Sequence, residues 1–212
     1  MEHFKEYSDN LERALLTLDR VAAETIIGNC FSAENRYSNG GEIISHTLMQ
    51  IGKLWENGNL ALSQVYTSGL ICEEAMDKIL PSVMKYNKKQ PVIAIGVYED
   101  HHLLGKRIIL SALRSSGYQV ADLGGGLHDD ALLKSVTKQK IKILLLSVLM
   151  LPSALHIKNL KLKLKDSGVI LVVGGAPFRL DKELWKEVNA DYTGKDSAEA
   201  IELVTNLVKE LS

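Results

Sequence analysis

From residue 91 to the end of the chain, short apolar runs alternate with stretches of helical periodicity. Runs of strand length lie at 93–97, 119–123, 141–147, 169–173 and 191–193. Helical patterns lie between and after them, at 104–116, 129–139, 154–167, 181–188 and 196–211. This alternation predicts βαβ units and a parallel sheet, and nearly continuous apolar runs are typical of strands buried on both faces. We predict a flavodoxin-like (Rossmann-like), doubly wound α/β sheet of five parallel strands, in the order 2-1-3-4-5.

Residues 1–88 have a different pattern, with helical periodicity and no convincing strand. Apolar residues between Leu11 and Ile26 recur at steps of three and four, which fits one helix or two short helices broken near Asp19. A second helical pattern includes Trp55 and ends at 56–59, and Ser63 could cap a third long helix. We predict a helical bundle cap domain at 1–88, followed by the α/β domain at 89–212.

Composition and charge exclude several classes of partner. The formal net charge is −1, from 25 basic and 26 acidic residues, so neither a nucleic acid nor an anionic membrane is expected. Cys30 and Cys72 lack CxxC spacing and fit buried thiols of a reducing compartment. The N-terminus lacks an apolar signal core, and no apolar run approaches the ~20 residues of a membrane span. These features predict a cytoplasmic protein.

Residues that could bind a metal or another ligand follow several of the predicted strands. Asp100, His102 and Gly105 follow the first strand, Ser147 ends the third, and glycines follow the fourth. Carboxyl ends of parallel strands meet at one edge of the sheet, where such folds bind ligands. A carboxylate that fixes the tautomer of a histidine favours metal binding by the other ring nitrogen. A metal cofactor with a long tail would suit this edge.

Each feature also has an ordinary explanation. A histidine in a loop is often a plain surface residue, and Ser147 could cap the next helix. The glycine pair 174–175 could be a tight strand-to-helix turn. The functional interpretation depends on all of these features facing the same edge.

Together these residues form a recognisable pattern. Asp-x-His-x-x-Gly at 100–105, Ser-x-Leu at 147–149 and Gly-Gly at 174–175 resemble the fingerprint of cobalamin-binding domains in corrinoid methyl-carrier proteins. The segment 51–58, IGKLWENG, followed by LSQVY at 62–66, looks like the helical cap that precedes such domains. The resemblance extends over nearly the whole chain.

The resemblance implies a corrinoid held base-off and His-on. His102 would be the lower axial ligand of cobalt, and Asp100 would hydrogen-bond its imidazole and tune its donation. The cobalt would alternate between methyl-Co(III) and Co(I). His101 is the competing ligand, and we favour His102 because of the spacing to Asp100 and Gly105.

Other roles also follow from the resemblance. Ser147 would bind the displaced nucleotide tail, Gly105, Gly174 and Gly175 would let the tail pass, and Leu149 would line its slot. Trp55 and Tyr66 would be lid residues that protect the upper face of the corrinoid. Leu54 could be either a lid residue or part of the bundle core.

The function implied is a methyl carrier that is a component of a methyltransferase system, without catalytic residues of its own. Its partners would be a substrate:corrinoid methyltransferase, a second methyltransferase with tetrahydrofolate or coenzyme M as acceptor, and a reductive activator. A cobalamin-dependent sensor is the alternative from another class. A mutase small subunit and a flavodoxin-like domain without its cofactor are further alternatives.

Some positions depart from the family pattern. The loop before His102 is a residue shorter than usual, and Leu103 stands where an acid commonly follows the histidine. The second predicted strand exits through glycines at 124–126 rather than a charged turn containing proline. These differences concern loop contacts with the corrin edge.

Overall fold

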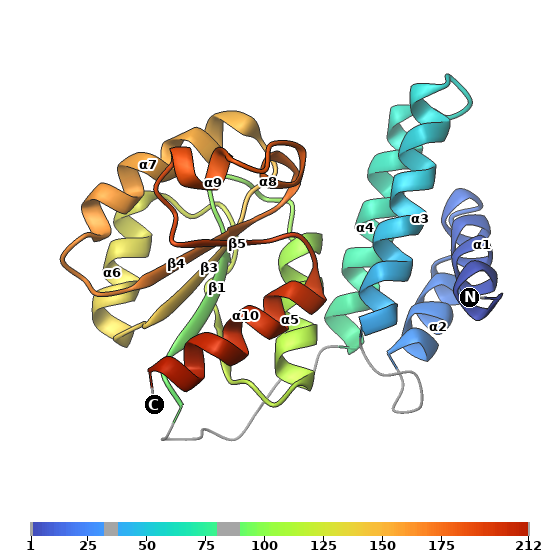
Figure 1. Cartoon of the computed structure of the whole chain (residues 1–212). Helices are drawn as coiled ribbons and strands as arrows, with labels where there is room; N and C mark the ends of the chain where they lie inside the picture. The colour runs from blue at the N-terminus through green and yellow to red at the C-terminus, as the bar shows by residue number, and fades with distance from the viewer. Residues whose placement is uncertain (1, 32–37, 80–89, 212) are drawn as a thin grey trace. The chain divides into compact units, whose positions relative to one another are not determined.

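The computed structural model describes residues 2–31, 38–79 and 90–211 and divides into two compact units, Met1–Val83 and Met84–Ser212 (Figure 1). The predicted boundary between residues 88 and 89 lies outside the described residues. None of the helices in these ranges is both long enough and apolar enough to cross a membrane.

The first unit is helical, as predicted. Its helices are α1 (Glu2–Leu16), α2 (Arg20–Cys30), α3 (Ser38–Glu56) and α4 (Leu62–Ile79). The alternative of two helices broken near Asp19 is confirmed, because the Asp19 side chain accepts a hydrogen bond from the Ala22 N–H and caps α2. The prediction that Ser63 caps the third helix is wrong, since α4 already includes Leu62.

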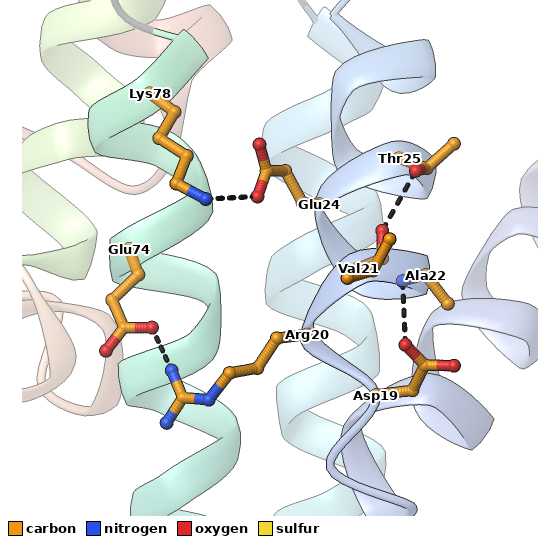
Figure 2. Close-up of polar contacts among 8 residues, drawn as sticks. All are labelled: Asp19, Arg20, Val21, Ala22, Glu24, Thr25, Glu74 and Lys78. Carbon is orange, nitrogen blue, oxygen red and sulfur yellow. Dashed lines mark hydrogen bonds and ion pairs between the residues drawn. The ribbon is translucent and has the colours of Figure 1, made fainter.

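Buried apolar side chains and surface ion pairs join the helices of this unit. Its core includes Leu11, Leu15, Ile27, Ile44, Ile51 and Met76. Figure 2 shows two ion pairs between α2 and α4, Arg20–Glu74 and Glu24–Lys78. Exposed pairs of this kind contribute little to stability, so the buried apolar contacts hold the bundle together. Cys30 and Cys72 are free and buried, and burial raises the pKa of the Cys30 thiol to about 11 and that of Cys72 to about 12.

The second unit is a parallel sheet with the predicted strand order, β2-β1-β3-β4-β5. The strands are β1 (Ile93–Val97), β2 (Val120–Asp122), β3 (Ile143–Ser147), β4 (Ile170–Gly174) and β5 (Tyr192–Gly194). All five residues of β1 are buried, as expected for a strand covered on both faces. In the register of the sheet, Ser147 at the end of β3 lies between Val97 of β1 and Gly174 of β4.

Helices cover both faces of this sheet (Figure 1). Side chains of α5 and α10 pack on one face, and those of α6, α7, α8 and α9 pack on the other. These helices are α5 (Leu104–Ser115), α6 (Asp129–Gln139), α7 (Leu151–Leu164), α8 (Ala176–Leu180), α9 (Leu184–Glu187) and α10 (Ser197–Glu210). Sequence periodicity missed α8 and placed the start of α7 three residues late. Pro152 and Pro177, in the first turns of α7 and α8, occupy positions where proline favours helix initiation.

Candidate functional site

The turn between β1 and α5 brings Asp100 against His102. Asp100 is buried, and its Oδ1 accepts hydrogen bonds from the backbone N–H of His101 at 2.6 Å and of His102 at 2.9 Å. The same oxygen lies 2.5 Å from Nδ1 of the His102 ring, whose side chain is 61% exposed. With the Nδ1–H donating to Asp100, Nε2 of His102 carries the lone pair that a metal would accept.

The charge of Asp100 is stabilised within this turn. Burial alone would raise the pKa of Asp100, but the hydrogen bonds from the His102 side chain and from the two backbone N–H groups outweigh it and hold the pKa below its usual value. Asp100 Oδ2 is buried, and no group in the described ranges hydrogen-bonds it. The histidine is therefore backed by a fixed carboxylate anion.

The start of α5 lies close to the end of β3. A Cβ atom added at Gly105 would lie 3.3 Å from the Ser147 hydroxyl oxygen. The prediction that Ser147 and Gly105 share one edge of the sheet is therefore confirmed. The alternative that Ser147 caps the next helix is wrong, because α7 has Met150 at its N-cap position.

The end of β4 completes the same edge. Gly175 has a φ of 118°, and a Cβ atom at this position would lie 1.9 Å from the carbonyl oxygen of Val148. Only glycine fits such a close approach between backbones. Gly175 is also the N-cap residue of α8, so the ordinary explanation of the glycine pair as a strand-to-helix turn is correct. The predicted absence of side chains at this strand end is correct as well. Leu149, in the loop after β3, is 41% exposed.

The exit of β2 packs along the Asp100–His102 turn. The backbone N–H of Gly126 donates to the Asp100 carbonyl at 2.5 Å, and Leu127 N–H donates to Val97 at 3.1 Å. A Cβ atom at Gly126 would lie 2.3 Å from the His101 ring, so this glycine leaves room for that histidine. The glycine-rich exit of β2, which departs from the family pattern, therefore accommodates the His101 ring.

A buried lysine next to the motif forms an ion pair that the sequence pattern does not predict. Lys106 follows Gly105 in α5, is almost fully buried, and its Nζ lies 2.6 and 2.7 Å from the carboxylate oxygens of Asp122 at the end of β2. Asp122 Oδ1 also accepts the N–H of Gly124 at 2.8 Å. The pair ties the start of α5 to the glycine-rich exit. The signal available in the sequence was Asp122, a charged residue near the end of the second predicted strand.

The two remaining predicted residues lie in the helical unit. Trp55 on α3 is 44% exposed, and Tyr66 on α4 is 66% exposed. Leu62, Tyr66 and Leu70 follow one another at intervals of four on α4, and all three are exposed. They form an apolar stripe on the surface of that unit.

The residues at the carboxyl edge of the sheet fit a metal complex with an extended tail. One imidazole, fixed through its Nδ1 by a buried carboxylate, presents a free nitrogen to a metal. Beside it, the Ser147 hydroxyl offers a polar group for the tail, and Gly105 places no side chain against that hydroxyl.

Comparison with known proteins agrees with this chemistry. Residues 91–202 match the B12 binding domain family. The chain is 32% identical over 171 residues to monomethylamine corrinoid protein 1 of Methanosarcina barkeri, covering 75% of this chain and 77% of that protein.

Solved structures give the same result. The structure of the M. barkeri monomethylamine corrinoid protein superposes with a TM-score of 0.79 at 27% identity, covering 96% of this chain and 99% of that one. A methanol:cobalamin methyltransferase complex from M. barkeri shares the fold alone, with a TM-score of 0.53 at 19% identity, covering 96% of this chain and 80% of that one. The chain therefore belongs to the B12-binding domain family, as a relative of the methylamine corrinoid proteins.

Proposed function

We propose that this chain binds a corrinoid with His102 as the lower axial ligand and carries a methyl group between two methyltransferases. The observation that supports this function most is the Asp100–His102 pair, with its free Nε2, beside Gly105 and Ser147. Membership of the B12-binding domain family supports the same cofactor. When bound, the corrinoid supplies a cobalt that can accept a methyl group and give it up again.

The protein's contribution at the lower face is to set the strength of one ligand. Asp100 keeps the proton on Nδ1 of His102 and so directs the Nε2 lone pair to the metal. The carboxylate also makes the imidazole a better donor, because its negative charge stabilises positive charge on the ring. The base-off, His-on state then depends on the geometry of this turn.

The nucleotide tail would lie along the ends of β3 and β4. The Ser147 hydroxyl would hydrogen-bond the tail, and Gly105, Gly174 and Gly175 would leave the space that it needs. Leu149 would contribute apolar contact through its exposed side chain. A tail buried in this slot would be kept away from the His102 side of the cofactor.

For the helical unit, we propose that Trp55 and Tyr66 contact the bound corrinoid. The support is their exposure together with that of the stripe on α4, since apolar side chains at the cofactor would exclude water from it. Trp185→Phe leaves Trp55 as the single tryptophan of the chain. Strong quenching of its fluorescence on corrinoid binding is expected, and unchanged fluorescence would contradict the contact.

The proposed partners are a methyltransferase that takes a small methyl donor of the methylamine kind and a second one that passes the methyl group to tetrahydrofolate or coenzyme M. A reductive activator would restore Co(I) after oxidation. The monomethylamine corrinoid proteins that this chain resembles support a partner that acts on a methylamine.

The test combines the cobalamin-loaded chain with candidate partners. The bound cobalt is reduced with titanium(III) citrate, isotope-labelled methylamines or methanol are added with the methyltransferase encoded nearby, and label is followed onto the protein and then onto the acceptor. Transfer in both steps is expected, with none in His102→Ala. Cobalamin uptake without turnover, together with a light-dependent change of oligomeric state in the adenosyl form, would favour the sensor.

A further inference from the structure

Glu99 has an unusual backbone conformation for its place in the fold. Its φ is 51°, in the left-handed region that residues other than glycine rarely adopt. Three other described non-glycine residues have positive φ, and each follows the end of a helix, where a left-handed residue closes the last turn: Leu18, Lys140 and Asn189. Glu99 instead follows a strand, directly before Asp100. Such a conformation persists only where surrounding contacts enforce it.

The carboxylate of Glu99 supplies contacts of this kind. Its Oε2 lies 2.8 Å from Nδ1 of His156 on α7, and its Oε1 lies 3.7 Å from Nδ1 of His128, the N-cap residue of α6. The Glu99 side chain is 21% exposed and that of His156 is 56% exposed. Ile157, the next residue on α7, is fully buried in the core and holds this part of the helix in place. Among the described residues, no group of three or more His, Cys, Asp or Glu side chains is arranged to hold a metal. The cluster is a hydrogen-bonded anchor.

Backbone contacts connect this anchor to the cobalt-ligand turn. The N–H of Glu99 donates to the Leu127 carbonyl at 2.9 Å, and the next residue, Asp100, accepts from Gly126 through its carbonyl. Rotation of the Glu99 backbone out of the left-handed region would break the first bond and turn the Asp100 carboxylate away from His102. The side-chain anchor on α7 opposes that rotation.

We propose that Glu99, held by His156, is a positioning residue that fixes the orientation of His102. The proposal rests on the proposed function, because the benefit of a fixed imidazole is a constant ligand strength at cobalt. It assigns a role to a hydrogen bond between residues 57 positions apart.

The test separates the effect of the Glu99 carboxylate from the effect of backbone strain at the same residue. Glu99→Gly removes the anchor but relieves the left-handed conformation, Glu99→Gln keeps an acceptor for His156, and His156→Leu removes the other partner. Glu183→Gln is the matched control, since Glu183 is an exposed carboxylate that bonds Lys186 at 2.7 Å away from the turn. Amide hydrogen exchange at residues 100–103 is measured in the apo-chain, and cobalamin affinity and the His-on spectrum in the loaded chain.

Exchange about fivefold faster, and a dissociation constant about fivefold higher, are expected in Glu99→Gly and His156→Leu, as for the loss of one charged pair whose histidine is 56% exposed to water. Glu99→Gln should lie near the wild type, and the control should be unchanged. If Glu99→Gly has the same amide exchange and the same His-on spectrum as the wild type, the positioning role is overturned and the proposed function is unaffected. A wild-type chain that binds no cobalamin would overturn the proposed function, and the positioning role with it.

Discussion

Replacing Asp100 by asparagine isolates the charge behind the histidine. Asparagine has nearly the same shape, and its Oδ1 can still accept the backbone N–H groups of His101 and His102 that Asp100 accepts in the structure. The turn should therefore keep its backbone conformation. What changes is the ring contact at 2.5 Å, which becomes a hydrogen bond to a neutral oxygen and no longer strengthens the donation of Nε2.

The size of the effect follows from the surroundings of the pair. Hydrogen bonds to charged groups are worth about 1.5–3 kcal/mol, and those between neutral groups about 1 kcal/mol. The difference is about 0.5–2 kcal/mol, and the top of this range does not apply because the His102 side chain is 61% exposed to water. A loss of about 1.4 kcal/mol corresponds to a roughly tenfold weaker affinity. This agrees with the 10- to 100-fold range found for changes behind a metal ligand.

The assay is a titration of the purified apo-chain with hydroxocobalamin, followed by the visible spectrum of the complex. Asp100→Asn should raise the Kd about tenfold and lower the His-on fraction, with unchanged circular dichroism. Asp196→Asn is the matched control, because Asp196 caps α10 by accepting the N–H of Glu199 and asparagine caps equally well. Equal Kd and equal spectra in Asp100→Asn and the wild type would refute the reasoning.

Two further substitutions test the surroundings of the turn. Gly105→Ala should leave stability nearly unchanged, since the new Cβ would lie 3.3 Å from the Ser147 oxygen. It should weaken cobalamin binding about tenfold, because the added methyl group would fill the tail slot. Cobalamin affinity equal to that of the wild type would contradict the proposed slot. Lys106→Met should lower the free energy of unfolding by about 2 kcal/mol in urea titrations. The loss is smaller than for a fully buried pair because Asp122 is 37% exposed. Unchanged stability would show that the ion pair does not stabilise the fold.

The sheet could be predicted from the sequence because each strand carries its own signal. The bounds of β1 and the strand order match the prediction, since fully apolar runs separated by helical patterns leave few alternative topologies. The short helix α8 was missed, because five residues are too few to show a helical period.

The placement of the motif residues at one edge of the sheet was also predictable, since they are close in sequence or end predicted strands. The contacts that hold the turn were not. Glu99 and His156 are 57 positions apart, and the spacing of His128 and His156 in the sequence does not connect them to the motif. Lys106 and Asp122 meet only because α5 packs beside β2 in the folded chain. Partners of this kind depend on side-chain packing between elements, which periodicity does not encode.

The central claim is that a protein imidazole, and not the benzimidazole of the cofactor, binds cobalt from below. Electron paramagnetic resonance of the Co(II) form decides this directly when the chain is produced with ¹⁵N-labelled histidine and loaded with unlabelled cobalamin. A protein ligand predicts doublet superhyperfine splitting in the wild type and its loss in His102→Ala. Triplet splitting in the labelled wild type, or a doublet that persists in His102→Ala, would contradict the account.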